Sequence, residues 1–215
     1  DLRFAIRTGN GEWLEFSTAA ARRPVLPLEV KTPDIARADL SPTLPDDCPV
    51  LVIRTWSLVN SLLALHFELI NKTNEPIEIG HLGIPMVFNN IMTGRSLAES
   101  NEKCSFSDPF IGLDAGYIQV TRLTGTGPAL IVVPDGNTPL EAYQLLREPT
   151  RPAQTFEGMF EWIVRSKTDA EKYWGKAEPW NPPTSETLPP KGRRVIGLRF
   201  LLADNIRSIE DTLKA

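Results

Sequence analysis

Apolar and polar residues alternate along three stretches of this sequence, and this alternation constrains the fold more than any other feature. The stretches are residues 2–8, 50–59 and 63–70. In the third stretch every second residue from Leu63 to Leu69 is Leu or Phe, so these side chains share one face of an extended chain. A period of two residues is typical of a half-buried strand, so we predict three such strands.

Five further stretches favour strands, and only short stretches favour helices. Residues 76–79, 117–123, 129–133, 154–164 and 193–202 are rich in the β-branched and aromatic residues that strands prefer. Short helices are predicted at residues 95–103, 139–146, 167–174 and 205–214. Because the strands do not alternate regularly with helices, a doubly wound parallel sheet is disfavoured.

We therefore predict a mainly β protein, an antiparallel β-sandwich with a few short helices. The sandwich domain is expected to cover residues 1–203, and residues 204–215 are expected to form a helical linker toward a further domain. Residues 24–49 and 176–190 are rich in proline, which fixes φ and removes a hydrogen-bond donor. We expect these two segments to be ordered loops.

The charge balance and the length of the apolar stretches exclude two classes of partner. The chain of 215 residues has 23 Lys and Arg against 27 Asp and Glu, a formal net charge of −4. Binding a nucleic-acid backbone requires a clustered excess of basic residues, which this sequence lacks. Its longest apolar stretches, residues 49–53 and 129–133, are far shorter than the roughly 20 residues that span a bilayer. We expect neither nucleic acid nor a membrane among its partners.

Histidine and cysteine are scarce, which limits metal and redox chemistry. The two histidines, His66 and His81, exclude a His-rich metal site within this chain, and the common cofactor motifs are absent. His66 is predicted to be a satisfied sheet residue, whereas His81 follows a strand in a turn where it could face a ligand. Cys48 and Cys104 either form one disulfide or remain structural thiols. We predict neither a metal nor a cofactor.

Two pairs of carboxylates are weak candidates for catalysis. Asp108 and Asp114 bracket one short segment, and Glu157 and Glu161 bracket another. Glycoside hydrolysis needs two carboxyl groups about 5 to 10 Å apart. Residues four apart on a strand are separated by roughly 13 Å, so Glu157 and Glu161 make a poor catalytic pair. A solvated sheet face or hydrogen bonds to a sugar are the alternative roles.

Aromatic side chains with polar neighbours favour a sugar-binding surface. Trp180 lies in a proline-rich segment, where it would offer a rigid ring to a pyranose while Asn181 bonds to its hydroxyl groups. The alternative is that Trp180 pins this loop to the sandwich. Trp162 is a second candidate ring, and Arg95 is a candidate hydrogen-bond donor. The predicted saccharide contacts are Trp162, Trp180, Asn181, Arg95 and His81.

Several segments resemble an uncharacterised family of large secreted fungal and bacterial proteins, known as a domain of unknown function. The resemblance is carried by residues 76–90, 108–117, 124–129, 155–162 and 178–184, and it covers most of the chain from about Leu65 onward. Members of that family are similar to glycoside hydrolases in which a supersandwich of the galactose-mutarotase type precedes a six-fold α/α barrel. The resemblance implies a carbohydrate-active extracellular protein whose principal catalytic carboxylates lie on the barrel.

These observations favour the β-sandwich portion of a secreted glycoside-hydrolase-like protein that acts on poly- or oligosaccharide. The chain begins at Asp1 rather than Met, so we expect a piece of a longer protein from which any signal peptide is already absent. The alternative is a noncatalytic module that binds carbohydrate or packs against the α/α-barrel domain of the same parent. A lyase or a mutarotase-like epimerase is a further alternative, for which His81 is the well-placed acid or base.

Overall fold

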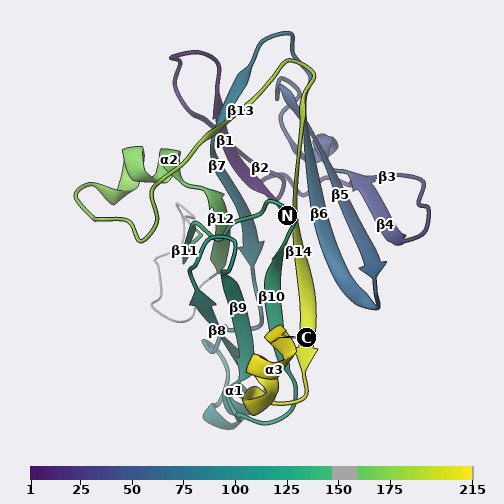
Figure 1. Cartoon of the computed structure of the whole chain (residues 1–215), viewed down its shortest axis with the longest axis vertical. Coiled ribbons are helices and arrows are strands. Elements are labelled where there is room, and N and C mark those ends of the chain that lie inside the picture. The colour runs from purple at the N-terminus through teal and green to yellow at the C-terminus, as the bar shows by residue number, and fades with distance from the viewer. Residues whose placement is uncertain (147–158, 215) are drawn as a thin grey trace.

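The computed structural model describes residues 1–146 and 159–214, which form two antiparallel β-sheets that pack face to face (Figure 1). The smaller sheet runs in the order β11 (Ala142–Leu145), β12 (Phe160–Arg165), β7 (Ile77–Met86), β1 (Arg3–Arg7) and β2 (Leu14–Ser17), with β13 (Glu186–Leu188) also paired to β7. The larger sheet runs in the order β3 (Leu26–Pro27), β4 (Asp34–Asp39), β5 (Val50–Val59), β6 (Leu62–Asn71), β14 (Arg193–Ala203), β10 (Ala129–Asp135), β9 (Tyr117–Arg122) and β8 (Ser105–Phe110). The predicted mainly β antiparallel sandwich is confirmed.

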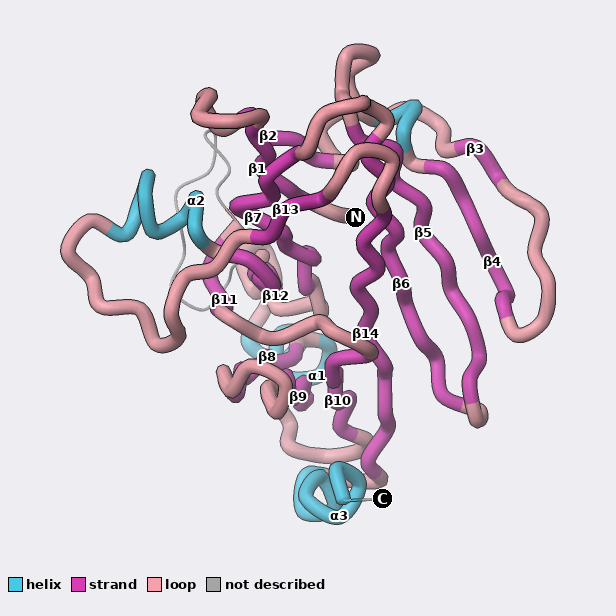
Figure 2. Tube along the Cα trace, turned by 45° about the horizontal axis from the view of Figure 1, so that its top comes forward, coloured by secondary structure: helices cyan, strands magenta, loops and turns pink. Residues whose placement is uncertain are grey.

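The helices are short and lie at the edges of the sandwich (Figure 2). α1 (Leu97–Lys103) begins with a capping box formed by Ser96 and Glu99. α2 (Lys167–Asp169) continues directly into one π-helical turn, η2 (Ala170–Trp174). The remaining helices are η1 (Ser41–Thr43), η3 (Ile206–Ser208) and α3 (Ile209–Lys214), which packs Ile209 against the larger sheet. None of the described helices is long and apolar enough to cross a membrane.

Two expectations about local structure are wrong. Residues 139–146, predicted as a helix, contain β11, because Tyr143 and Gln144 pair with Trp162 and Glu161 of β12. The proline-rich segments predicted as loops also contain strands, with β3 and β4 in the first and β13 in the second. β3 is the edge strand of the larger sheet, a position where proline is tolerated because one side needs no ladder hydrogen bond.

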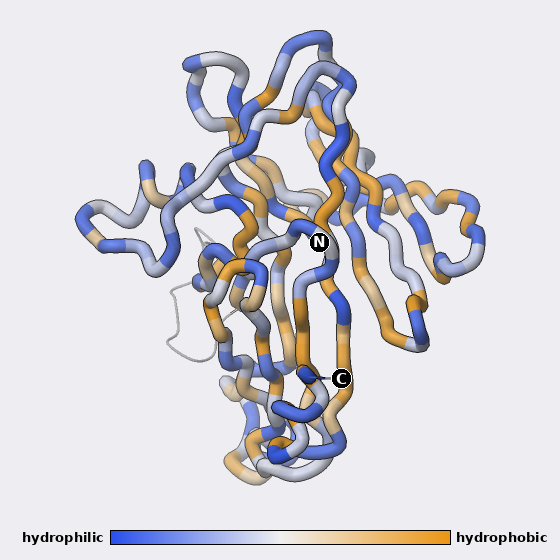
Figure 3. Tube along the Cα trace, viewed as in Figure 1, coloured by the Kyte–Doolittle hydropathy of each residue, from blue (hydrophilic) through white to orange (hydrophobic). Residues whose placement is uncertain are grey.

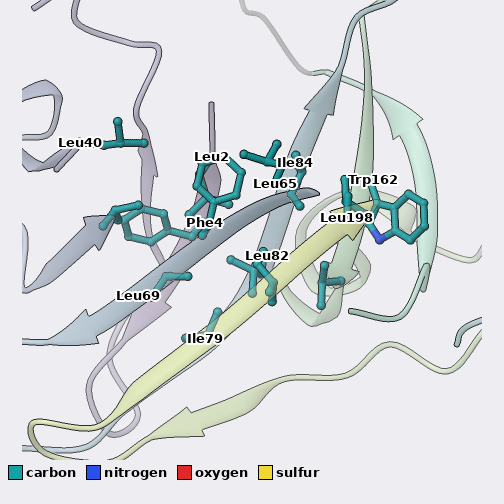
Figure 4. Packing of buried hydrophobic residues seen from close by; sticks show 14 of the residues in the cluster. Leu2, Phe4, Leu40, Leu65, Leu69, Ile79, Leu82, Ile84, Trp162 and Leu198 are labelled. Atoms are coloured by element: carbon teal, nitrogen blue, oxygen red, sulfur yellow. The ribbon is translucent and has the colours of Figure 1, made fainter. Parts of the chain in front are cut away.

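The core lies between the two sheets and is built from alternate residues of their strands. Figure 3 shows hydrophobic and hydrophilic residues succeeding one another along these strands. Phe4 of β1, Phe67 of β6 and Trp162 of β12 are each at most 1% exposed, and Figure 4 shows Phe4 and Trp162 among the packed side chains. Trp162 was predicted to stack on a sugar, and the structure corrects this prediction. Its ring is inside the core, where Nε1 donates to the Pro139 carbonyl oxygen at 3.2 Å.

The residues between those core positions face the opposite side of the smaller sheet, away from the larger one. Arg3 and Ala5 take these positions on β1, Glu161 takes one on β12, and His81 takes one on β7. His81 is the direct cross-strand partner of Ala5. The α2–η2 segment lies on this side of the sheet, beside β7 (Figure 1). The outer face therefore gathers polar residues from strands that are far apart in the sequence.

Candidate functional site

A cavity of about 300 Å³ lies between the outer face of the smaller sheet and the α2–η2 segment. Its polar lining residues are Arg3, Glu15, His81, Gln144, Thr168, Asp169 and Tyr173, and its apolar lining residues are Phe4, Ala5 and Phe16. Sites for small molecules typically combine an apolar wall with a few fixed polar groups. This cavity is therefore the candidate functional site.

His81 is the centre of a buried ion network beside the cavity. Its Nδ1 donates to Asp169 Oδ2 at 2.6 Å, and its Nε2 donates to Glu161 Oε1 at 3.1 Å. Arg3 Nη1 donates to the other oxygen of Glu161 at 2.9 Å. The side chain of Glu161 is 0% exposed and that of Asp169 is 6% exposed. Because water hardly reaches these groups, their interactions are screened far less than those of surface ion pairs.

The two carboxylates keep His81 charged. Burial alone lowers the pKa of His81, because it disfavours the imidazolium, but the charge of Glu161 and the hydrogen bonds to Asp169 and Glu161 outweigh burial and raise the pKa to about 9. His81 is therefore a cation at neutral pH, with both ring nitrogens donating. In this state it has no lone pair that can accept a proton, so it does not serve as a general base.

Two glycines of β7 make room for the groups that pack over this strand. A Cβ atom on Gly83 would overlap the carboxylate of Glu161, and one on Gly80 would overlap the Trp13 ring and Thr168 Oγ1. Such close approach of a side chain to a strand backbone requires glycine. The two positions therefore let Glu161 and Thr168 lie directly against β7.

Polar contacts hold the α2–η2 segment against the sheet. Lys172 Nζ and Tyr173 Oη donate to Glu15 Oε1 of β2 at 2.7 and 3.1 Å. Gln144 Nε2 of β11 donates to Asp169 Oδ1 at 2.8 Å. The segment is thus tied to two strands at opposite ends of the smaller sheet, and it forms one wall of the cavity.

The structure brings only some of the predicted catalytic and binding residues together. His81 and Glu161 meet in the ion network, whereas Glu157 lies outside the described residues. Asp108 is exposed on β8 of the larger sheet, and Asp114 is exposed in the loop that follows β8. Of the four candidate carboxylates, the described part of the chain therefore places Glu161 alone in the network beside the cavity.

Arg95 and the two cysteines are engaged elsewhere. Arg95 Nη2 donates to Asn89 Oδ1 at 2.9 Å, and Arg95 Nη1 contacts Cys104 Sγ at 2.8 Å. Cys48 and Cys104 are both buried free thiols. Of the two alternatives for the cysteines, the structure has the structural thiols rather than the disulfide.

Trp180 is exposed to solvent and does not line the cavity. Its side chain is 83% exposed, so it buries little surface against the sandwich, which disfavours the alternative that it pins its loop. The neighbouring Asn181 donates from Nδ2 to the Glu141 carbonyl oxygen at 2.9 Å and anchors the loop. The ring is thus presented on an anchored segment, and saccharide stacking at Trp180 stays a prediction.

Trp180→Ala is expected to weaken saccharide binding by about 1 kcal/mol, or roughly fivefold, because the stacking ring is lost. The free energy of unfolding should change by less than about 0.5 kcal/mol, since the side chain is mostly exposed. Titration calorimetry with an oligosaccharide panel and urea unfolding measure the two quantities. Unchanged affinity would remove Trp180 from the binding surface.

Sequence reasoning missed most of the residues that line the cavity, among them Arg3, Thr168 and Asp169. Arg3 bonds to a residue 158 positions away, and Asp169 bonds to one 88 positions away. Contacts between residues so far apart in the sequence cannot be predicted from a local sequence pattern. The signal that was available is the alternation in residues 2–8, which places Arg3 on the polar face of its strand.

The sequence matches the model of a family described as "Family of unknown function (DUF5695)" over residues 1–215, which confirms the resemblance to a domain of unknown function. No curated protein matches. The fold is similar to that of a polysaccharide lyase, BACCELL_00875, with a TM-score of 0.66 and 12% identity over 99% of this chain and 27% of that chain. An identity this low shows the fold alone. Because the match covers 27% of that lyase, this chain spans about a quarter of its length.

Two other solved structures are more distant. An α-galactosidase from Lactobacillus brevis has a TM-score of 0.46 and 7% identity over 94% of this chain and 29% of that chain. The Slr1438 protein from Synechocystis sp. PCC 6803 has a TM-score of 0.40 and 11% identity over 85% of this chain and 66% of that chain. Likenesses at this level carry no argument about the site.

Proposed function

The chain belongs to the DUF5695 family of unknown function, and on that premise we propose that it is the saccharide-binding β-sandwich module of a larger carbohydrate-active protein. The observation that carries the proposal is the cavity on the outer face of the smaller sheet. The similarity of the fold to part of a polysaccharide lyase supports a place within a longer protein that acts on poly- or oligosaccharide.

The chemistry of the cavity suits a sugar. Its volume of about 300 Å³ is at the lower end of the range for small-molecule sites. Arg3, Glu15 and Gln144 offer donors and acceptors for hydroxyl groups, while the ring of Tyr173 offers apolar surface to the C–H face of a pyranose. Rigid strands and an anchored segment hold these groups in place, which lowers the entropic cost of binding.

We place the bond-breaking carboxylates of the parent protein outside this module. Both oxygens of Glu161 are already bonded, to His81 and to Arg3, and the other described candidates, Asp108 and Asp114, are exposed away from the cavity. The proposed parent is secreted and glycoside-hydrolase-like, with an α/α-barrel domain that carries the catalytic pair. The module then holds one part of the saccharide chain while the barrel cleaves it.

Tyr173→Ala tests the cavity. The side chain is 46% exposed and lines the cavity, so its loss should weaken oligosaccharide binding by about 1 kcal/mol, or roughly fivefold. Phe106→Ala is the matched control, because Phe106 is 43% exposed but lies on β8 of the larger sheet. Titration calorimetry on the wild-type chain and both variants measures the affinities.

Weaker binding in Tyr173→Ala together with wild-type affinity in Phe106→Ala supports the cavity as the saccharide site. Equal losses in both variants would point to a nonspecific effect of removing exposed rings. If the wild-type chain binds no member of a broad oligosaccharide panel, the proposed function is wrong.

A further inference from the structure

Several polar groups that line the cavity are already bonded to the protein. Both ring nitrogens of His81 are bonded, one to Asp169 and the other to Glu161. Both carboxylate oxygens of Asp169 accept, from His81 and from Gln144. The amide of Gln144 is bonded at both ends, because its Oε1 accepts from Trp174 Nε1 at 3.1 Å. These side chains hold one another in place and have little left to offer a ligand.

Arg3 and Glu15 differ, because each has an accessible atom with no partner in the described part of the chain. Lys172 and Tyr173 both donate to Glu15 Oε1, which leaves Oε2 unbonded, and this side chain is 44% exposed. Arg3 donates from Nη1 to Glu161 and is 23% exposed. Its Nε and Nη2 bond to no described residue and are not among the buried unpaired atoms, so they reach solvent.

The two residues are neighbours on adjacent strands. Glu15 of β2 pairs with Ala5, and Arg3 of β1 pairs with Ser17, so Arg3 and Glu15 are diagonal neighbours on the outer face. Such neighbours are about 7–8 Å apart, which long side chains can span. Burial raises the pKa of Glu15, but hydrogen bonds from the η2 turn and the charges of Lys172 and Arg3 outweigh burial and lower the pKa. Glu15 is therefore a carboxylate at neutral pH.

The opposite charges of these two groups restrict the chemistry of what can bind both. A carboxylate on a ligand would gain the guanidinium of Arg3 but would be repelled by Glu15, and an ammonium group would meet the reverse situation. A hydroxyl group is both a donor and an acceptor. Two adjacent hydroxyls can therefore donate to the carboxylate and accept from the guanidinium, and hydrogen bonds to charged partners are the stronger kind.

We propose that Arg3 and Glu15 recognise two adjacent hydroxyl groups of one uncharged sugar unit. One hydroxyl donates to Glu15 Oε2, and its neighbour accepts from the guanidinium of Arg3. This inference rests on the proposed function and adds the class of sugar and the two residues that determine specificity. A sugar that lacks either hydroxyl leaves a charged group of the protein unpaired, so the pair discriminates by ring position.

Single sugar units test the proposed recognition. The probes are the methyl glycosides of glucose, galactose, mannose and xylose with their monodeoxy derivatives, each of which lacks one hydroxyl group at a known position. NMR titration of the wild-type chain measures their affinities. For the glycoside that binds most tightly, we expect two derivatives to bind about tenfold more weakly than the parent. The hydroxyls that they lack should lie on adjacent ring carbons.

Two variants assign these hydroxyls to their partners. Glu15→Gln removes the charged acceptor and should weaken binding of the parent glycoside about tenfold. One of the two derivatives should then bind as well as the parent, because its missing hydroxyl no longer has a partner to lose. Arg3→Lys keeps a cation beside Glu161 but lacks the guanidinium fork, so it should abolish discrimination at the adjacent ring position.

The measurement separates recognition from a structural role of Glu15. If Glu15 only held Lys172 and Tyr173, its replacement would weaken all probes by the same factor. The melting temperature of Glu15→Gln should stay within about 3 °C of the wild type, since exposed ion pairs contribute little to stability. Glu102→Gln is the matched control, because it removes one negative charge from an exposed residue of α1 and should leave both affinity and discrimination unchanged.

Two results would overturn this inference and leave the proposed function standing. The first is an equal loss of affinity for the parent glycoside and all its derivatives in Glu15→Gln. The second is tighter binding of the methyl glycoside of glucuronic acid or of glucosamine, which carry a charge, than of the neutral probes. Binding of oligosaccharides without binding of any single sugar unit would also overturn the inference alone, and binding of neither would overturn both.

Discussion

Glu141→Ala is expected to lower the free energy of unfolding by about 3–5 kcal/mol, because it would leave several buried donors unpaired. The Glu141 side chain is 2% exposed and accepts four hydrogen bonds. Ser166 N and Thr184 N donate to Oε1 at 3.1 and 2.7 Å, and Thr184 Oγ1 donates to Oε2 at 2.6 Å. Ser166 Oγ also donates to Oε1. This carboxylate therefore joins the end of β12 to the chain just before β13.

Urea unfolding monitored by circular dichroism measures this effect. Glu141→Gln keeps the length of the side chain and one carbonyl oxygen, so it should lose less than Glu141→Ala, although its amide group would face donors. Glu178→Ala is the surface control, since Glu178 is exposed, and it should change the free energy of unfolding by less than about 0.5 kcal/mol. A Glu141→Ala variant as stable as Glu178→Ala would contradict the structural role of this carboxylate.

Strands with a regular alternation were predictable from the sequence because the pattern records which face is buried. Residues 50–59 match β5 in full, and residues 63–70 fall within β6 (Leu62–Asn71). The short edge strands were not predictable, since β2, β3 and β13 bury too few residues to show a period. The segment 139–146 contains residues that favour helices. It nevertheless forms a strand because it pairs with β12, which lies later in the sequence, and local residue preferences do not show that pairing.

The position of the candidate site depended on which residue of each strand faces outward. Glu161 and Trp162 are neighbours on β12, so only one of them can face the core. The sequence suggested that both contact a saccharide, whereas the structure places Trp162 inside and Glu161 on the outer face with His81. His81 lines the cavity, and its contact with a ligand stays a prediction, because both of its ring nitrogens are bonded to Asp169 and Glu161. His66 instead bonds to Asp135 Oδ2 at 2.9 Å on the larger sheet.

The ion network predicts a loss of stability as the pH rises through about 9. The pKa of His81 is raised from 6.5 to about 9 in the folded state, so the imidazolium stabilises the fold fully below about pH 6.5 and loses this contribution as the pH rises through about 9. A shift of this size corresponds to roughly 3 kcal/mol. The amino terminus acts in the opposite sense, because burial and the charge of Arg54 lower its pKa from 8.0 to about 6. Its contribution has to be separated from that of His81.

His81→Gln makes this separation, since the amino terminus is the same in both proteins and cancels in their difference. At about pH 6 the variant should be less stable than the wild type by about 3–5 kcal/mol, because the carboxylates of Glu161 and Asp169 lose the cation between them. The difference should shrink by roughly 3 kcal/mol once the pH exceeds about 9, because wild-type His81 is then neutral as well. Urea unfolding of both proteins from pH 6 to pH 10 measures it. Two parallel curves over that range would show that His81 is not held as a cation by these carboxylates.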